Sequence, residues 1–274
     1  MEFVEAKSTI WKQENPVNHI ARCARVCYAS ENKTNNENFV KNLERNKHYS
    51  MFRHVGVYYI IPARLDINPK AFIDAKIKLV GHKYYVSVNA QAATEYWDYK
   101  FAKYGISTEE AFKNDIFRRY KLLRYTFYIE TGIDITREFN RKSPNNIAEQ
   151  STRYVDFCKK LGIQFKKCHW MYNLNIYKRF LVNIMAKTIE IFYKISRSKY
   201  GLNLPPQDAR WILALDTMSR VAYTYTVEEW EYIINLRLFD WTGVAHSDAK
   251  IVAKQIKKQL ENEGYVIRNF KEIK

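Results

Sequence analysis

Residues 137–154 read Arg137-Glu138-Phe139-Asn140-Arg141-Lys142-Ser143-Pro144-Asn145-Asn146-Ile147-Ala148-Glu149-Gln150-Ser151-Thr152-Arg153-Tyr154, and no other window of the chain is so polar. Pro144 and the asparagines after it favour a turn over a helix interior. Arginine forks hold phosphates or carboxylates at two points, and loops placed by a rigid scaffold often carry binding residues. The stretch therefore predicts an anion-binding loop. A solvated turn, with arginines paired to nearby glutamates, is the alternative that local sequence leaves open.

Length and composition indicate one globular domain spanning residues 1–274, because 47% hydrophobic and 15% aromatic content allows a large core. No run of eighteen apolar residues occurs, and the N-terminal residues lack a secretory pattern, so we expect a cytoplasmic protein without a membrane segment. The four cysteines, Cys23, Cys27, Cys158 and Cys168, are too few for a disulfide framework. We predict reduced, buried thiols and no metal site.

The charge is strongly basic, with 45 Lys and Arg against 29 Asp and Glu, or +16. Such a chain attracts polyanions, which include nucleic acids, nucleotides, phosphorylated cofactors and polyglutamyl folates. The lysines are scattered rather than gathered in one block, and an AT-rich coding sequence would also enrich Asn, Lys, Ile and Tyr. Charge alone does not choose among these partners.

The N-terminal half shows patterns of both helix and strand. Apolar spacing predicts helices over 17–28 and about 39–45, with a polar loop over 30–38 between them. Aromatic and β-branched residues predict strands over 55–61 and 83–90. His54 precedes the first of these strands, and a lone histidine is more often structural than a ligand.

A capping box at Ser107 and Glu110 opens the next predicted element. Apolar residues follow it at three- and four-residue spacing, and they predict a helix to about Glu130, closed by Gly132: Phe112, Ile116, Tyr120, Leu123 and Phe127. Residues 133–136 then look like a strand. The polar stretch would therefore sit at a strand end.

Helices dominate the remainder of the predicted structure. An apolar stripe over 181–195 predicts a long helix, and Pro206 marks another helix start. A second capping box, Thr226 and Glu229, opens a helix whose apolar side lies next to Arg237, and a last helix covers 247–263. No glycine-rich phosphate loop can be written, so side chains must hold any nucleotide.

Five segments in order resemble the flavin-dependent thymidylate synthases (ThyX). That family has an Arg-His-Arg triplet, seven residues, then Ser-x-Arg-Tyr, and residues 141–143 and 151–154 fall in the same register. The other matching segments are Ala24 to Tyr28, Ser50 to Val55, Pro206 to Leu213, and Trp230 to Arg237 with His246 beyond. The resemblance runs along most of the chain.

This resemblance implies an α+β fold, a single ThyX-like domain with a central, mostly antiparallel sheet and flanking long helices. It implies reductive methylation of dUMP to dTMP by an FAD-dependent methyltransferase, with NADPH and methylenetetrahydrofolate as co-substrates. It also implies a homotetramer with active sites shared between subunits. Nucleic acid is not an expected partner. Reduced flavin rather than a cysteine activates the uracil ring, so the protein must orient three anionic molecules.

By position, the resemblance assigns seven residues to dUMP: Glu138, Arg141, Glu149, Ser151, Arg153, Arg210 and Arg237. Of these, Arg237 and Ser151 are assigned to the reaction centre. Arg237 would lie nearest the uracil and flavin, and Ser151 would be a substrate ligand, since no His-Asp pair lies nearby to make it a nucleophile. The resemblance assigns a further set to the cofactor side: His54, Arg141, Lys142, Ser143, Tyr232 and His246.

Several departures from the family pattern fall on the flavin side. Lys142 and Ser143 replace the histidine and second arginine of the triplet, and Arg53 replaces a glutamate. Asn146 for a serine, Ala214 for a proline, and Thr226 and Glu228 at flavin contacts complete the set. A divergent member could release a 5-hydroxymethyl pyrimidine nucleotide instead. A basic nucleic-acid-binding protein that has lost catalysis, or a scaffold with a vestigial site, are the other readings.

Overall fold

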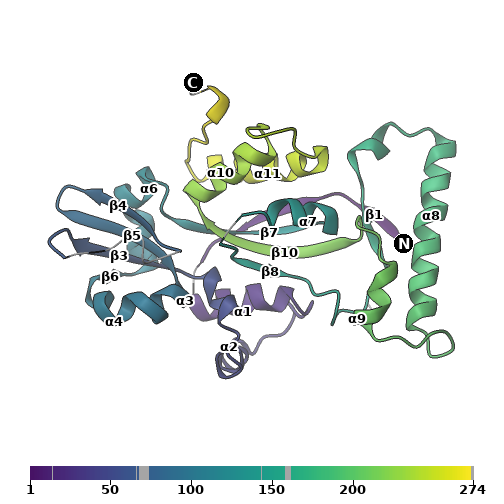
Figure 1. Cartoon of the computed structure of the whole chain (residues 1–274), viewed down its shortest axis with the longest axis horizontal. Helices are drawn as coiled ribbons and strands as arrows, with labels where there is room; N and C mark the ends of the chain where they lie inside the picture. Colours follow the sequence, from purple (N-terminus) through teal and green to yellow (C-terminus); the bar gives the residue numbers. More distant parts are fainter. Residues whose placement is uncertain (14, 66, 68–73, 143, 158–161, 273–274) are drawn as a thin grey trace.

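The computed structural model describes residues 1–13, 15–65, 67, 74–142, 144–157 and 162–272, and its fold is α+β, as the sequence predicts (Figure 1). The strands are β1 (Glu2–Val4), β2 (Lys7–Trp11), β3 (Gly56–Pro62), β4 (Lys76–Val80), β5 (Lys83–Asn89), β6 (Gly105–Ile106), β7 (Arg124–Gly132), β8 (Ile147–Glu149), β9 (Gln164–Lys166) and β10 (Met218–Thr226). The α-helices are α1 (Pro16–Val26), α2 (Asn36–Arg45), α3 (Ala90–Ala92), α4 (Asp98–Phe101), α5 (Thr108–Lys113), α6 (Asp115–Arg119), α7 (Ile133–Phe139), α8 (Ile176–Arg197), α9 (Pro206–Ala209), α10 (Val227–Arg237) and α11 (Ser247–Asn262).

The first sheet runs β2-β7-β10-β8 through the described residues, and every neighbouring pair is antiparallel. Its two long central strands are buried on both faces because helices cover each side. α10 and α11 pack on one face, where Phe127 meets Trp230 edge to face at 4.9 Å between ring centroids. α1 covers the other face, where Cys23 and Val26 join the core. Figure 1 shows these helices above and below β10.

The second sheet has the order β4-β5-β3-β6 in the described residues and lies to the left in Figure 1. It has its own core, in which Trp97 stacks on Tyr59 at 5.7 Å between ring centroids. The predicted strands over 55–61 and 83–90 are confirmed as β3 and β5, which pair antiparallel from Gly56 to Pro62. One face of the second sheet therefore has a core of its own, while Tyr58 of β3 joins the core of the first sheet.

α8 lies beside the parallel pair β1–β9, at the right of Figure 1. The predicted long helix is confirmed, but its apolar stripe faces outward. Among its described residues, Ala186, Glu190, Tyr193 and Ser196 are the buried ones. The exposed apolar residues of the same helix are Ile176, Tyr177, Phe180, Leu181, Ile184, Met185, Ile191, Phe192 and Ile195.

Residues 107–136 correct two sequence predictions. The capping box at Ser107 and Glu110 is confirmed, but the helix that it opens ends at Lys113, and α6 ends at Arg119. Residues 124–132 form the central strand β7, so the predicted helix to Glu130 is wrong. Residues 133–136, predicted as a strand, begin α7 because buried Ile135 and Phe139 follow helical spacing. The polar stretch therefore begins in the last turn of α7 and includes β8, instead of following a strand.

The remaining helix predictions are confirmed within a few residues. α1 begins at Pro16, α2 begins at Asn36 and the last helix is α11. Thr226 and Glu229 form the predicted capping box of α10. Cys23 and Cys168 are buried free thiols and Cys27 is partly buried, whereas Cys158 lies outside the described residues. No described helix combines the length and apolar character needed to cross a bilayer.

Candidate active site

Glu138 joins two of the predicted arginines. It lies in the last turn of α7, where its carboxylate meets Arg141 Nη2 at 3.0 Å and Arg237 Nη1 at 3.2 Å. Arg141 is 68% exposed, whereas Arg237, the last residue of α10, is 12% exposed. Burial lowers the pKa of Arg237, and Glu138 opposes that shift. The ion pair with Glu138 thus holds Arg237 in place, while the exposed guanidinium of Arg141 remains accessible to an anion.

Glu149 ends β8 and is held by side chains of α7 and β10. Its Oε1 accepts hydrogen bonds from Thr136 Oγ1 at 2.7 Å and from Ser219 Oγ at 3.4 Å. Asn140 Nδ2 donates to the other oxygen at 3.5 Å, and Asn140 in turn accepts from Tyr223. These contacts hold the Glu149 carboxylate in one orientation. It can therefore accept a hydrogen bond from a ligand hydroxyl group at one fixed place.

Ser151, Arg153 and Arg210 form a second group, at an open edge of the molecule. Ser151 N donates to Cys27 O at 2.9 Å, and Ser151 Oγ accepts from Arg153 N at 3.1 Å. Arg210 follows α9 and reaches Thr152 Oγ1 at 3.3 Å. Both guanidinium groups are exposed. No contact recorded among the described residues joins this group to the Glu138 group.

Lys142 turns inward, away from the exposed arginines. Its Nζ lies 3.1 Å from Glu229 Oε1, and Glu229 is buried at the start of α10. Burial alone would raise the pKa of Glu229, but Arg124, Lys142 and Lys76 lower it to about 2. Lys142 is therefore the counter-ion of a carboxylate of the fold. Ser143 lies outside the described residues.

His54 lies fully inside the core. Its Nδ1 contacts Thr224 Oγ1 at 2.8 Å, and hydrogen bonds continue through Thr126 to His19 Nε2. Burial lowers the pKa of His54 to about 3 and that of His19 to about 4, so both rings are neutral at pH 7. In this structure His54 is a buried residue hydrogen-bonded to Thr224 of β10.

Tyr232 and His246, the remaining predicted cofactor residues, are exposed. Tyr232 meets Trp241 edge to face, 5.7 Å between ring centroids. His246 caps α11, since its Nδ1 accepts a hydrogen bond from Asp248 N at 3.2 Å. Both side chains remain accessible to a ligand.

A model of the family described as thymidylate synthase complementing protein matches residues 113–263. The chain belongs to this family. The matched segment contains the complete set of residues predicted to bind substrate, from Glu138 to Arg237, while His54 and the second sheet precede it. No curated protein matches the chain.

The chain is similar to solved structures at low sequence identity. A UMP/dUMP methylase, PolB from Streptomyces cacaoi bound with 5-Br dUMP, is 14% identical, with 96% of this chain and 93% of that chain covered and a TM-score of 0.45. Thymidylate Synthase X (ThyX) from Helicobacter pylori, solved with FAD and dUMP, is 18% identical, with 62% and 83% covered and a TM-score of 0.40.

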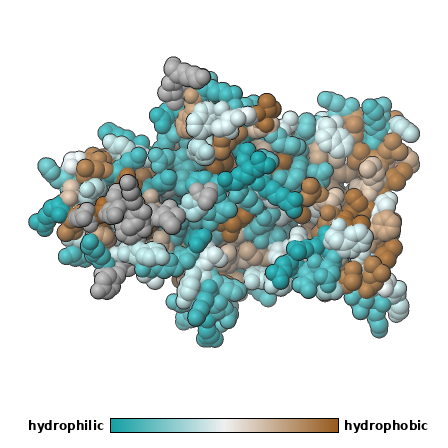
Figure 2. All heavy atoms as spheres, in the orientation of Figure 1, coloured by the Kyte–Doolittle hydropathy of each residue, from teal (hydrophilic) through white to brown (hydrophobic). Residues whose placement is uncertain are grey.

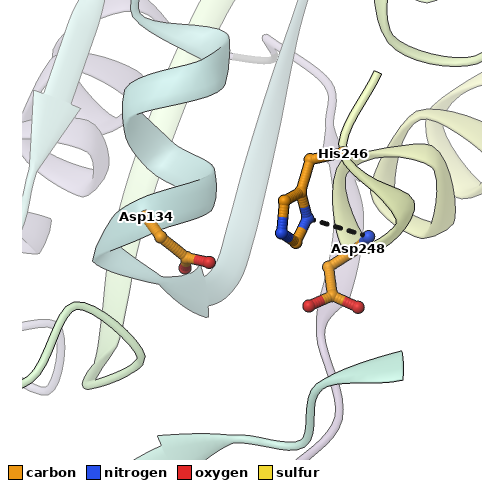
Figure 3. Close-up of side chains that lie close together, drawn as sticks. All are labelled: Asp134, His246 and Asp248. Atoms are coloured by element: carbon orange, nitrogen blue, oxygen red, sulfur yellow. Dashed lines mark hydrogen bonds between the residues drawn. The ribbon is translucent and has the colours of Figure 1, made fainter. Parts of the chain in front are cut away.

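In this member of the family, Asp134, His246 and Asp248 lie close enough to resemble a metal site (Figure 3). Lys166 supplies the cation there: its buried Nζ lies 2.6 Å from Asp134 and 2.7 Å from Asp248. His246 Nδ1 already accepts a backbone hydrogen bond, which leaves the proton of a neutral ring on Nε2. The donor set therefore fits a lysine ammonium better than a metal ion.

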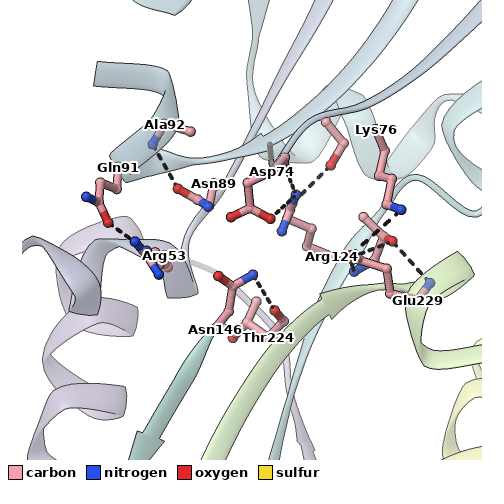
Figure 4. Close-up of polar contacts among 12 residues, drawn as sticks. Arg53, Asp74, Lys76, Asn89, Gln91, Ala92, Arg124, Asn146, Thr224 and Glu229 are labelled. Atoms are coloured by element: carbon pink, nitrogen blue, oxygen red, sulfur yellow. Dashed lines mark hydrogen bonds and ion pairs between the residues drawn. The ribbon is translucent and has the colours of Figure 1, made fainter. Parts of the chain in front are cut away.

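Arg53, at the position where the resemblance expects a glutamate, joins α3 to the loop before β8, and Figure 4 shows its contact with Gln91. Its Nε donates to Gln91 Oε1 at 2.7 Å, and its Nη1 donates to Asn145 O at 3.4 Å. Nearby, the buried Arg124 reaches from β7 to Asp74, with Nη2 2.7 Å from the Asp74 carbonyl oxygen. Sequence reasoning missed Arg124 and Asp74, because no local pattern marks a pair fifty residues apart.

Proposed function

We propose that the chain catalyses reductive methylation of dUMP to dTMP, with methylenetetrahydrofolate as carbon donor, FAD as hydride carrier and NADPH as electron source. The observation that carries this proposal is the family match over residues 113–263, which includes every residue predicted to bind dUMP. The exposed guanidinium groups near Ser151 supply the cations that a nucleotide phosphate needs.

The group of Ser151, Arg153 and Arg210 would bind the phosphate and sugar of dUMP. Arg153 and Arg210 present exposed forks, and Ser151 Oγ offers a hydroxyl beside them. The fixed carboxylate of Glu149 would accept a hydrogen bond from a sugar hydroxyl. These side chains bind and orient; none of them has the neighbours of a nucleophile.

Arg237 would stabilise negative charge that develops on the pyrimidine. Its guanidinium is mostly withdrawn from water, where electrostatic stabilisation is strongest, and Glu138 sets its orientation. Arg141, which shares Glu138, would meet the anionic groups at the entrance to the site. Removing Arg237 should therefore reduce turnover more than it weakens nucleotide binding.

The flavin fits one side of this site better than the other. FAD, when bound, would supply the hydride. Arg141, Tyr232 and His246 are exposed and could contact it, but Lys142 is held by Glu229 and His54 is buried. We assign the cofactor contacts to the exposed residues, and give Lys142 and His54 no part in the chemistry.

A hydroxymethylase is the second candidate, and the engagement of Lys142 with Glu229 favours it. A cofactor side rebuilt in this way could admit water to the methylene group and yield a 5-hydroxymethyl nucleotide. Mass analysis of the product separates the two activities. A plain methyl product excludes the hydroxymethylase.

We also propose a homotetramer in which each site uses residues of more than one subunit. The outward apolar stripe of α8 supports this, and Figure 2 shows apolar side chains gathered at that end of the molecule. The Glu138 group and the Ser151 group would then meet across subunits. Light scattering should find a tetramer, and a variant with Ile184→Glu and Phe192→Glu should dissociate and lose dUMP binding. Lys258→Glu on α11 is the control that should remain assembled.

Purified protein tests the proposal directly. We expect a yellow protein whose flavin spectrum changes when dUMP is added. A colourless protein that FAD cannot reconstitute would rule out the flavin mechanism. Arg153→Ala and Arg237→Ala test the site separately, and unchanged dUMP binding in Arg153→Ala would show that the phosphate site has been assigned wrongly.

A further inference from the structure

A groove of about 900 Å³ opens beside α1, on the face of the first sheet opposite α10 and Arg237. None of the residues assigned to dUMP or flavin lines it. Five basic and two acidic side chains do, which gives the groove a net charge of +3: Lys7, Arg22, Arg25, Lys33 and Arg220, with Glu31 and Glu130. Its size lies in the range of small-molecule sites.

Arg25 is the most unusual of these cations, because it is only 4% exposed. Its Nε and Nη2 donate to Asn36 Oδ1 at 3.3 and 3.1 Å, and Nη2 also donates to Asn35 O at 3.1 Å. All of these acceptors are neutral, and no carboxylate pairs with Arg25 among the ion pairs of the described residues. A buried cation held by neutral groups is stabilised further when an anion approaches.

Arg220 and Arg22 complete the walls of the groove. Arg220 lies 3.6 Å from Glu31 and 3.5 Å from Glu130, distances at which it can turn toward a stronger acceptor. Arg22 lies over Trp11, 3.8 Å from the ring centroid, and Trp11 stacks on Tyr128. The aromatic pair thus gives the arginine a rigid support.

We propose that this groove binds a small polyphosphate anion, of the class of a nucleoside triphosphate or inorganic tripolyphosphate. Arginine forks match phosphate oxygens, and Lys7 and Lys33 add charge at the rim. A small ligand fits better than nucleic acid, because Glu31 and Glu130 interrupt the basic surface and would repel a continuing phosphate backbone.

Two backbone hydrogen bonds connect the groove to the loop that carries Ser151. Gln150 N donates to Arg220 O at 2.7 Å, and Ser151 N donates to Cys27 O, directly after α1. A ligand held by α1 and Arg220 therefore restricts the backbone of this loop. Occupancy of the groove should slow local opening of the loop that carries Ser151. Any effect of this on dUMP binding rests on the proposed function, whereas the binding of the anion does not.

Calorimetric titration of the whole protein with tripolyphosphate, ATP and phosphate tests the site. We expect tripolyphosphate and ATP to bind more tightly than phosphate. The double variant Lys7→Glu and Lys33→Glu should weaken both by roughly tenfold or more, because like charges replace attraction at the rim. The matched control is Lys254→Glu with Lys258→Glu, exposed lysines of α11 with the same change of charge, and it should retain parental affinity. Thermal unfolding confirms that both variants fold.

Three results would overturn the site: no tripolyphosphate binding, equal loss in both double variants, or much tighter binding of long oligothymidylate than of ATP. The last would make the groove a nucleic-acid surface. Hydrogen exchange at the Gln150 and Ser151 amides tests the connection, and these amides should exchange more slowly with tripolyphosphate bound. Unchanged exchange in a protein that binds the anion would refute the connection alone. Neither anion binding nor amide exchange involves dUMP or flavin, so each can fail while the proposed function holds, and the reverse.

Discussion

The two antiparallel sheets differ in what they carry. The first sheet is covered by helices on both faces, and the residues predicted to bind dUMP lie on it or on segments joined to it, within the matched residues 113–263. The second sheet, built from residues 56–106, precedes that match and packs around Trp97. At the junction it contacts the first sheet and α10, where Lys76 meets Glu229 and Ser87 accepts a hydrogen bond from Arg124. The second sheet thus contains none of the residues predicted to bind dUMP, all of which belong to the first sheet or to segments joined to it.

A matched pair of tryptophan substitutions gives the largest expected effect. Trp230 and Trp97 are both fully buried, one in each core, so Trp230→Ala and Trp97→Ala should each reduce the free energy of unfolding by about 3–5 kcal/mol. Only Trp230→Ala should also weaken dUMP binding, because α10 carries Arg237. Urea unfolding and dUMP titration measure both effects. Loss of dUMP binding in folded Trp97→Ala protein would mean that the second sheet helps to form the nucleotide site.

Acid should weaken the junction between the sheets, where Glu229 meets Lys142 and Lys76. The folded-state pKa of Glu229 is lowered from 4.5 to about 2, so its contribution to stability is present above pH 4.5 and is lost as pH falls toward 2. The contribution is on the order of 3 kcal/mol. In urea unfolding between pH 7 and pH 3, Glu229→Gln should lose stability at neutral pH and show a flatter acid dependence than the parent. Parallel curves would contradict this role.

Arg237→Ala should lower turnover roughly 100-fold, as removal of a charge-stabilising donor does in other enzymes. Arg237→Lys should recover part of this loss, since a lysine keeps the charge without the fork. Steady-state kinetics with dUMP measure kcat and KM separately. Arg119→Ala on α6, which removes an exposed arginine outside the site, is the control and should leave both constants unchanged. Equal loss in the control would point to net charge instead.

Substitutions in the two capping boxes give the smallest expected changes in unfolding free energy, and they compare one cap beside each sheet. Thr226 is buried and begins α10 on the first sheet, whereas Ser107 is exposed and begins α5 after the second sheet. Thr226→Ala should cost about 1–2 kcal/mol and Ser107→Ala about 0.5 kcal/mol, because the buried donors have no water to replace the cap. Thermal unfolding measures both, with Thr226→Ser as the conservative control. A larger loss at Ser107 would reverse this ranking.

Local signals predicted the elements whose ends are marked by their own residues. Ser107, Pro206 and Thr226 lie at helix starts that the structure confirms. β10, a central strand, was missed, since its buried run Met218–Thr226 shows no alternation.

The misread segment 107–132 has a physical explanation. Phe112, Ile116, Leu123 and Phe127 happen to fall at helical spacing, but Lys121 adopts a φ of 58° and ends the helical course. Beyond it, Tyr125, Phe127 and Ile129 alternate in the strand, where both faces are buried. A single-residue backbone reversal carries no strong sequence signal.

The candidate site divides in a similar way. The sequence singled out Glu138, Arg141 and Arg237, and the structure brings these three together by ion pairs. The local sequence does not predict that Lys142 contacts Glu229, because Glu229, a capping residue of α10, lies almost ninety positions away. The burial of His54 likewise depends on Thr224, a residue of the unpredicted strand β10.

Lys166 ties three parts of the chain through its ammonium group: Asp134 at the start of α7, Asp248 at the start of α11, and its own strand β9. A metal ion in that place would make the junction depend on the supply of that ion and on competing chelators. A lysine is made with the chain and cannot dissociate. This corner of the fold should therefore assemble in the same way in metal-rich and metal-poor surroundings, and treatment with EDTA should leave its thermal stability unchanged.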